Sequence, residues 1–230
     1  MNFEFYRNSI FSDSLKKYKT MQLFSLSRIF LSFFLFFSLT SFSNNLFKMS
    51  GVPHKLDTTV LGAGCFWCIE AVFLSLNGVE SVESGYTGGD LKNPSYKDIC
   101  TGNTGHAEVA KIVYNPDVIS FKEILEIFWK THDPTTLNRQ GNDIGSQYRS
   151  VIFYLNETQK KIASFYKDQL EKSGAWDKSI VTEISELGEY YKAENYHQNY
   201  YQQNKNESYC KYVIQPKLEK FKKVFQDKLK

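Results

Sequence analysis

Residues 57–76 read Asp57-Thr-Thr-Val-Leu-Gly-Ala-Gly-Cys-Phe-Trp-Cys-Ile-Glu-Ala-Val-Phe-Leu-Ser-Leu76, and this stretch decides the fold. Asp57 to Leu61 predicts a short strand, and the glycines at 62–64 predict a flexible turn. A helix is expected next, because apolar side chains recur at helical spacing: Phe66, Ile69, Phe73 and Leu76. Gly78 offers a C-terminal cap for it. Cys65 therefore opens a helix that follows directly from a strand.

The sequence downstream predicts alternating strands and helices. Further strands are expected at Val79–Tyr86, His106–Tyr114, Ser150–Leu155 and Ser179–Ser185. Ser120 with Glu123, and Asn156 with Gln159, are N-terminal caps of two amphipathic helices. Residues 88–105 and 131–148 read as long polar loops, and the second is too long to be only a connection. The order β-α-β-β-α-β-α-β predicts an α+β, ferredoxin-like mixed sheet with helices on one face.

The C-terminal part reads as two segments. Glu189 to Asn206 is dense in Tyr, Asn and Gln without a sustained period, and we expect an extended wrap over the surface. Residues 213–230 predict an amphipathic helix with an apolar stripe of Leu218, Phe221, Phe225 and Leu229. A helix packed on the catalytic domain, expected at 56–212, is favoured over a helix on a membrane surface.

The first 48 residues differ from the rest and predict a signal peptide or leader. Basic side chains at Lys16, Lys17, Lys19 and Arg28 precede an apolar run from Ile29 to Leu39. The run is shorter than the roughly 20 residues of a membrane-spanning helix, which favours export or tethering through this segment. A start at Met49 would instead give a cytoplasmic protein.

Composition bounds the function classes. The chain has 230 residues, 42% hydrophobic, which suffices for one catalytic domain with appendages. A net charge of +3 does not favour nucleic acid as a partner, and we expect a monomer. Four cysteines are too few for a disulfide-built scaffold, so their placement suggests chemistry.

Cys65 is the first candidate for that chemistry. A helix N-terminus favours the thiolate through the helix dipole and unpaired N–H groups. Considered alone, a cysteine at such a position is a small buried hydrophobe about as often as it is a reactive thiol. Phe66 and Trp67 could form an apolar wall beside the sulfur, although Phe66 also lies on the core stripe.

Glu108 is the second candidate. In the strand expected at His106–Tyr114 it shares a face with Ala110 and Ile112, which points its carboxyl group into a partly apolar place. Desolvation would keep the carboxyl protonated, so that it could donate a proton to a polar oxygen. An exposed edge-strand glutamate explains the spacing equally well.

Three separated motifs give the chain a family resemblance. They are Gly64-Cys-Phe-Trp67, Gly102-x-Thr-Gly-His-Ala-Glu108 and Gln140-Gly-Asn-Asp-x-Gly-x-Gln-Tyr-Arg149. In sequence and order they resemble the A-type peptide methionine sulfoxide reductases, and the resemblance extends over Thr58 to Pro216. It implies a ferredoxin-like fold and reduction of methionine S-sulfoxide, free or in oxidised proteins and peptides. It also implies a thioredoxin-like reductant, with no cofactor and no metal.

The resemblance further implies roles for single residues. Cys65 is the nucleophile, Phe66 and Trp67 surround the substrate methyl group, and Glu108 is the acid. The remaining residues donate to the sulfoxide oxygen (Tyr96 and Tyr148), organise the pocket (Asp143) or attack the oxidised Cys65 (Cys210).

The recycling step is where the chain departs from many family members. It has cysteine at position 68 and Lys211 after the distal cysteine. Cys68 lies one turn along the same helix as Cys65, and a disulfide within one turn would require that turn to unwind. We therefore expect Cys65–Cys210 to form first and Cys68 to act as a relay or competitor. Cys100 is interpreted as a structural thiol.

Two other classes explain the cysteines less completely. A C-x-x-C that opens a helix also occurs in thioredoxin-like dithiol oxidoreductases, but that interpretation gives Glu108 no role. A zinc module could use Cys65, Cys68 and Cys210 with His106 or Cys100, although structural zinc sites usually present two compact ligand pairs.

Overall fold

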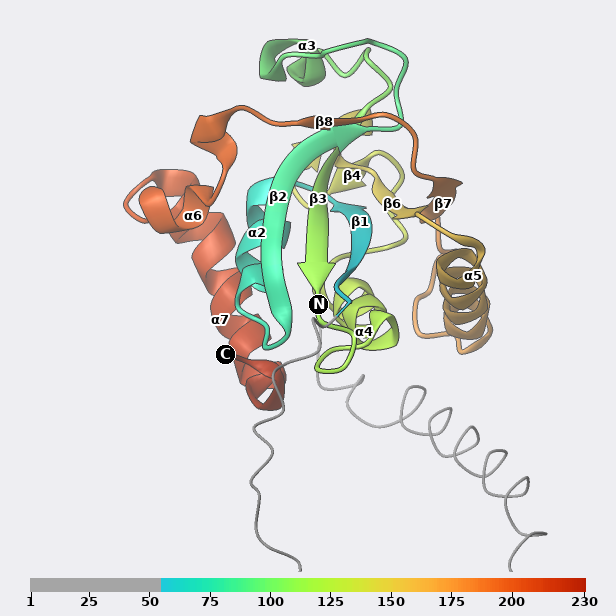
Figure 1. The fold of residues 1–230 in the computed structure, drawn as a ribbon. Helices are drawn as coiled ribbons and strands as arrows, with labels where there is room; N and C mark the ends of the chain where they lie inside the picture. Colours follow the sequence, from blue (N-terminus) through green and yellow to red (C-terminus); the bar gives the residue numbers. More distant parts are fainter. Residues whose placement is uncertain (1–54) are drawn as a thin grey trace, which may run out of the picture. The chain divides into compact units, whose positions relative to one another are not determined.

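The computed structural model describes residues 55–230, whose centre is a strongly curled six-stranded sheet (Figure 1). The strand order is β7-β6-β1-β3-β2-β8, and neighbouring strands are antiparallel except β6 and β7, which run parallel. The strands are β1 Asp57–Ala63, β2 Val79–Thr87, β3 Ala107–Tyr114, β6 Ser150–Tyr154, β7 Glu183–Glu186 and β8 Tyr190–Lys192. A separate hairpin consists of β4 Arg139–Gln140 and β5 Asp143–Ile144.

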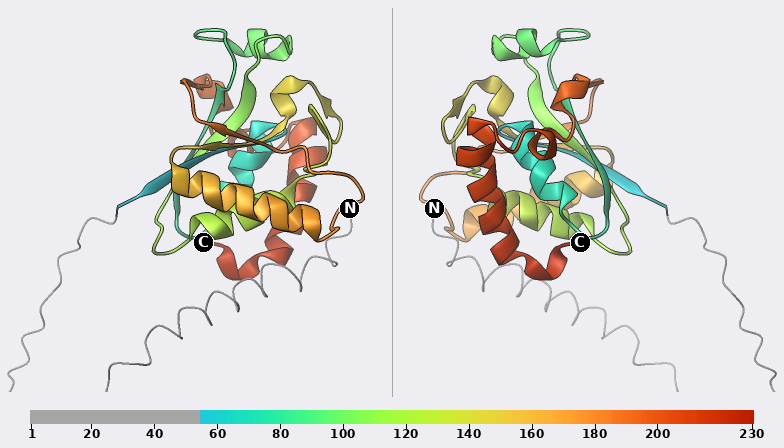
Figure 2. Two further views of the ribbon diagram at one scale, coloured as in Figure 1. Left: turned by 90° about the vertical axis from the view of Figure 1, so that its right-hand side faces the viewer. Right: turned by 90° about the vertical axis from the view of Figure 1, so that its left-hand side faces the viewer.

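Helices pack against this sheet, which confirms an α+β fold. They are α2 Phe66–Leu74, α3 Tyr96–Cys100, α4 Phe121–Thr131, α5 Glu157–Lys172, α6 Tyr200–Gln203 and α7 Gln215–Val224. Helix α2 packs on β2 and β3, α5 packs against β6 and β7, and α7 lies along α2 (Figure 2). Short turns of 3₁₀ or π type are η2 Ser146–Tyr148, η3 Asn195–His197, η4 Cys210–Ile214 and η5 Gln226–Lys228.

The central strand β1 is buried on both faces. Its consecutive residues Val60 and Leu61 point to opposite faces, and both are fully buried. Val60 belongs to an apolar cluster that is completed by Leu187, from the connection between β7 and β8, and by Tyr190, the first residue of β8. The chain that leaves β1 therefore enters α2 from the best-packed part of the domain, which fixes the position of Cys65.

The predicted helix caps are confirmed. Ser120 and Glu123 form a reciprocal capping box at α4, and the Asn156 side chain accepts a hydrogen bond from the backbone N–H of Gln159 at α5. Each cap satisfies N–H groups that the first turn of a helix leaves without partners.

The predicted turn at 62–64 and the cap at Gly78 are wrong in detail. Gly62 continues β1 and pairs with Val151, where an added Cβ would approach the Val151 side chain to 2.8 Å. Gly64 alone makes the turn, with a φ of +88°. Helix α2 already ends at Leu74, and Gly78 serves the turn into β2.

The two predicted loops contain regular structure. Residues 88–105 include α3, which a capping box of Ser95 and Asp98 starts, and residues 131–148 include the hairpin β4–β5. The strand expected at Ser179–Ser185 is β7, shifted to Glu183–Glu186, and β8 follows it. These elements have two to five residues, too few to show a hydrophobic period.

The C-terminal helix packs on the domain, as the favoured interpretation predicted. Leu218, Phe221 and Phe225 are buried. Among residues 55–230 no helix is long and apolar enough to cross a membrane. The predicted leader, residues 1–48, lies outside the described part of the chain.

Candidate active site

The N-terminus of α2 holds Cys65 at the end of the central strand. Cys65 is the N-cap residue, with a non-helical backbone (φ −56°, ψ 124°), and its side chain makes no capping hydrogen bond. At Gly64 an added Cβ would lie 2.7 Å from the Gln140 side chain, so the turn and the hairpin β4–β5 are in close contact. The turn that leads into Cys65 therefore packs against this hairpin.

Burial sets the protonation of the two neighbouring thiols. It raises the pKa of Cys65, which is 7% exposed, well above its usual range, and the hydrogen bond to Cys68 raises it further. The pKa of Cys68 is lowered to about 7, first by that hydrogen bond and then by the positive charge of Lys217. The helix N-terminus was expected to favour the thiolate of Cys65, but in the resting site burial outweighs it. The thiolate is therefore favoured at Cys68 over Cys65 in the resting site.

Glu108 lies beside Cys65 as a buried acid. The carboxyl group is 2% exposed, and its Oε2 accepts a hydrogen bond of 3.1 Å from the backbone N–H of Phe66, the residue next to the nucleophile. Burial raises the pKa of Glu108 to about 8, so the carboxyl is mostly protonated at neutral pH. The prediction that this side chain points into an apolar place is confirmed, and the exposed-edge alternative is wrong.

The predicted aromatic residues surround the same point. Phe66 is fully buried and so belongs to the core as well as to the site. The indole of Trp67 is only partly buried and stacks on Tyr200, with ring centroids 3.7 Å apart. Tyr96 and Tyr148 pack against the cluster that contains Cys65. Burial raises the pKa of both tyrosines, so their hydroxyl groups remain proton donors.

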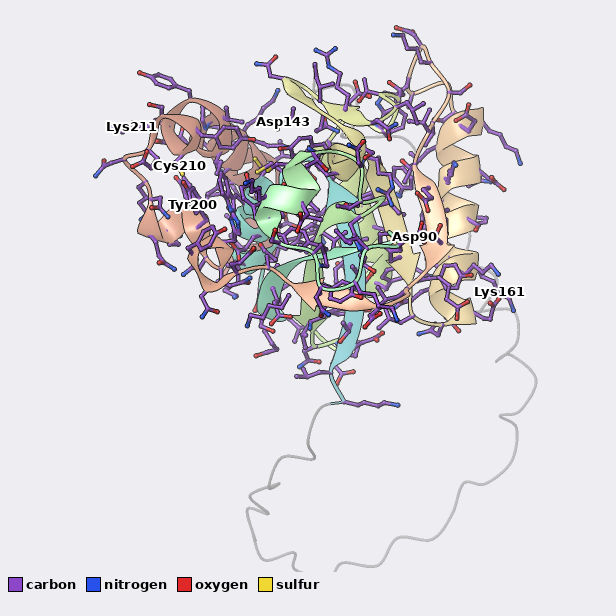
Figure 3. The ribbon with its side chains drawn as sticks, turned by 90° about the horizontal axis from the view of Figure 1, so that it is seen from above. Asp90, Asp143, Lys161, Tyr200, Cys210 and Lys211 are labelled. Carbon is purple, nitrogen blue, oxygen red and sulfur yellow. The ribbon has the colours of Figure 1, made fainter. Side chains whose placement is uncertain are left out.

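The three cysteines proposed for the chemistry meet in this cluster. Cys65, Cys68 and Cys210 are buried together with Phe66 and Ile99, although Cys210 is far along the chain. The hydroxyl of Tyr209 donates a 2.9 Å hydrogen bond to Asp143 in the hairpin, which connects the hairpin to the segment of Cys210. Figure 3 shows Cys210 beside Tyr200, with the side chain of Lys211 directed outward. The structure thus brings every predicted site residue to one place.

Comparison with known proteins agrees with this geometry. A family model described as "Peptide methionine sulfoxide reductase" matches residues 57–229. The chain belongs to this family. The "Peptide methionine sulfoxide reductase MsrA" of Trichodesmium erythraeum is 55% identical over 174 residues, which cover 76% of this chain and 98% of that protein. The protein of the same description from Saccharolobus solfataricus is 51% identical, with 76% and 98% coverage.

Solved structures of methionine sulfoxide reductases share the fold. The reduced form of Mxr1 from Saccharomyces cerevisiae aligns with a TM-score of 0.64 at 36% identity, over 69% of this chain and 91% of that chain. Methionine sulfoxide reductase A of Corynebacterium diphtheriae gives a TM-score of 0.59 at 38% identity, over 67% and 77%. The thioredoxin-like interpretation of the C-x-x-C is therefore rejected.

The sequence did not reveal the carboxylates that hold the aromatic side chains of this reductase. Glu194 accepts hydrogen bonds from the backbone N–H of Tyr96 (2.8 Å) and the hydroxyl of Tyr86 (3.0 Å). Glu70 accepts from the backbone N–H of Asn199 (2.8 Å) and of Tyr200 (3.2 Å), and so fixes the ring that stacks on Trp67. Their only signal in the sequence was the unusual density of polar and aromatic residues after Glu189.

His197 lies next to both Trp67 and Glu194. Its Nδ1 accepts a 3.1 Å hydrogen bond from the indole N–H of Trp67, so Nε2 carries the ring proton of a neutral imidazole. Nε2 faces Oε2 of Glu194 at 3.8 Å. Burial lowers the pKa of His197, which favours this neutral form. The imidazole therefore lies between the indole of Trp67 and the carboxylate that holds Tyr96.

Two further interpretations of the sequence need correction. Cys100 is exposed at the end of α3 and hydrogen-bonds with Tyr96, so it is no buried structural thiol. Of the ligands considered for a zinc module, His106 is engaged elsewhere: Nδ1 accepts from the backbone N–H of Gly89 (3.1 Å), and Nε2 lies 2.7 Å from the carbonyl oxygen of Leu91. In the described part of the reductase no group of three His, Cys, Asp or Glu side chains is arranged for a metal ion.

Proposed function

We propose that Cys65 attacks the sulfur of a methionine S-sulfoxide while Glu108 gives a proton to its oxygen. The observation that carries this assignment is the buried Glu108 carboxyl, protonated at neutral pH and bonded to the N–H of the residue after Cys65. A sulfoxide oxygen gains negative charge as a nucleophile adds to sulfur, and a neutral acid at that place lowers the barrier. The chain is accordingly a peptide-methionine (S)-S-oxide reductase.

The first chemical step balances on the groups present. The Cys65 sulfur forms a bond to the sulfoxide sulfur, and the oxygen takes the proton of Glu108. The S–O bond of the substrate then breaks and the hydroxyl group bonds to the Cys65 sulfur, while the S–S bond breaks and leaves its electron pair on the substrate sulfur. Methionine leaves, and Cys65 becomes a sulfenic acid. The thiol proton of Cys65 is released during the attack and restores Glu108, so the net reaction is thiol plus sulfoxide to sulfenic acid plus thioether.

Recognition of the substrate follows from two kinds of surface. Phe66 and the exposed part of Trp67 provide an apolar wall for the methyl group. Glu108, Tyr96 and Tyr148 provide protonated donors for the oxygen, and Asp143 organises the hairpin side of the pocket. Only one epimer at sulfur can place its methyl group and its oxygen on the matching surfaces; the other leaves donors unpaired.

Separate assays with the two sulfoxide epimers test this function. We expect methionine to form from the S epimer, free or in a peptide, and not from the R epimer. Insulin disulfide reduction serves as the control for dithiol chemistry and should proceed much more slowly than sulfoxide reduction. Comparable rates on both epimers would contradict the proposed pocket.

The proposal extends to the setting of the enzyme. A solved structure holds Mxr1 of Saccharomyces cerevisiae "in complex with Trx2", and we propose a thioredoxin-like donor for this chain too. The basic residues and the apolar run in residues 16–39 support export of the enzyme or its tethering to a membrane. The order of strands and helices supports the ferredoxin-like interpretation of the sheet. We propose a monomeric enzyme with its catalytic domain at 56–212 and its packed C-terminal helix at 213–230.

A further inference from the structure

The position of Cys68 relative to Cys65 differs from what the helix pattern suggested. Cys65 is the N-cap of α2 and has a non-helical backbone, and Cys68 is the third helical residue. Two other helices among residues 55–230 have polar side chains in contact at the same two positions, the N-cap and the third helical residue. There the side chains meet, with Ser95 Oγ 2.6 Å from Asp98 Oδ2 and Ser120 Oγ 2.8 Å from Glu123 Oε2. Side chains at these two positions reach each other without unwinding the helix.

The two thiols at the start of α2 also interact through their side chains, and this interaction raises the pKa of Cys65 and lowers that of Cys68. The expectation that Cys65–Cys210 forms first assumed that both Cys65 and Cys68 lie within the helix, and this assumption is wrong. A disulfide between Cys65 and Cys68 requires only a side-chain adjustment at the N-cap.

A lysine from another helix faces the second sulfur. Lys217 on α7 and Cys68 line a small cavity of about 10 Å³, whose other walls are mostly apolar. The side chain of Lys217 is only partly exposed. Among residues 55–230 no carboxylate lies within ion-pair distance of its ammonium group. An unpaired cation beside a buried sulfur stabilises the thiolate more than the thiol.

We propose that Lys217 is a positioning residue for the recycling step, which holds Cys68 as a thiolate so that Cys68, before Cys210, attacks the sulfenic acid of Cys65. The proposal rests on the sulfoxide reductase activity proposed above, because that activity supplies the sulfenic acid.

Several charges act on Cys68 from the elements packed around it. The hydrogen bond from Cys65 and the cation of Lys217 lower its pKa, as does a hydrogen bond from Tyr209. Burial and the carboxylate of Asp143 raise it, and the balance lies at about 7. Glu108, also close to Cys68, is mostly neutral at that pH. The Cys210 thiol is shifted in the opposite direction: burial and the charges of Cys68 and Glu207 raise its pKa. At neutral pH Cys68 is therefore the better nucleophile of the two.

The step balances as a substitution at sulfur. The Cys68 thiolate forms a bond to the Cys65 sulfur, and the S–O bond of the sulfenic acid breaks. The leaving hydroxide takes a proton from Glu108 and departs as water, and Glu108 later regains a proton from solvent. Cys210 then remains for thiol–disulfide exchange with the Cys65–Cys68 disulfide, which passes the oxidation toward the external donor.

Variants of Lys217 test the proposal through the pH dependence of disulfide formation. The enzyme receives one equivalent of sulfoxide without reductant, and the disulfide is followed by quenching and non-reducing peptide mapping. Lys217→Met should slow formation of Cys65–Cys68 about fivefold at neutral pH, and the difference should vanish at high pH, where Cys68 ionises without help. Lys217→Arg, which keeps the charge, should restore the rate. Lys223→Met, an exposed lysine on the same helix, is the matched control and should behave as the wild type.

Two results would overturn the proposal. One is an unchanged pH profile in Lys217→Met. The other is a dominant Cys65–Cys210 disulfide in the wild type together with normal cycling of Cys68→Ser. The single methionine formed per enzyme before recycling reports the first step separately. If that methionine does not appear in the wild type, the proposed function fails; if it appears and the Lys217 effect does not, only the recycling assignment fails.

Discussion

The first turn of α2 and the segment from Ala193 to Cys210 contribute to the same site by different means. In the first turn, the nucleophile, two aromatic residues and a second thiol are consecutive, and a single local geometry places all four. In the second segment, the contributing side chains are separated by others and act through hydrogen bonds to distant parts of the chain. His197 is 130 residues from Trp67, and Glu194 is 98 residues from Tyr96.

The first turn of α2 therefore supplies the reactive groups, whereas the second segment orients the side chains around them. The reactivity of Cys65 and Cys68 depends on a helix N-terminus and on burial, which any variant of the second segment leaves largely in place. The orientation of Trp67 and Tyr96 depends on carboxylate and imidazole partners that the second segment supplies. Substitutions in the first turn should therefore lower the rate of the chemical step, and substitutions in the second segment should mainly weaken recognition of the substrate.

The largest effect is expected for Cys65→Ser. A hydroxyl group lacks the nucleophilicity of a thiolate, so formation of methionine should be abolished while the fold stays intact. Single-turnover assays and thermal unfolding together check this. Cys68→Ser is the control, because it should still form one methionine per enzyme. Turnover of Cys65→Ser near the wild-type rate would remove the basis of the assignment.

Glu108→Gln should have the next largest effect, a loss of roughly 10²-fold or more in the first step at neutral pH. In the wild type, the first step should slow as the pH rises through about 8, because Glu108 then loses the proton that it donates. The glutamine side chain of the variant cannot titrate, so this decrease should be absent there. The variant should also lose less at low pH, where solvent acid partly substitutes. Equal losses at every pH would indicate that Glu108 only holds the N–H of Phe66.

A smaller, recognition-type effect is expected in the second segment for His197→Phe. The change removes the acceptor for the indole N–H of Trp67, which loosens one wall of the pocket. We expect kcat/KM to fall about tenfold, mainly through KM, together with a change in the near-ultraviolet circular dichroism of Trp67. His197→Asn offers an acceptor oxygen in a similar place and should recover most of the loss. A fall confined to kcat would place His197 in the chemical step instead.

The sequence predicted the first region better than the second for a physical reason. The helix at Phe66–Leu74 and the face of Glu108 follow from local periodicity, which a contiguous stretch carries in full. The partners of Glu70 and Glu194 lie 98 to 130 residues away, and no local pattern encodes such distances. The same limit explains why the protonation state of the Cys65 thiol was not predicted correctly. A helix N-terminus is visible in the sequence, whereas the desolvation that outweighs it comes from distant side chains.

The smallest effect is expected for Tyr209→Phe, where the two regions meet. The Tyr209 hydroxyl donates to Asp143 at 2.9 Å and also lies within hydrogen-bonding range of Cys65 and Cys68. Its ring is partly exposed, so water can replace the lost donor to Asp143 and limit the loss to roughly 1 kcal/mol, a few-fold in kcat/KM.

A double-mutant cycle with Asp143→Ala, which removes the acceptor, makes this small effect interpretable. If Tyr209 acts through Asp143, each single variant already breaks the contact, and the double variant should lose little more than the larger single loss. Additive losses would show that Tyr209 acts on the cysteines directly. Tyr212→Phe, an exposed tyrosine on the same turn, is the matched control and should leave kcat/KM unchanged. Because Tyr209 adjoins Cys210, movement of Cys210 during disulfide exchange would break the same contact, so Tyr209→Phe should lower recycling less than it lowers sulfoxide reduction.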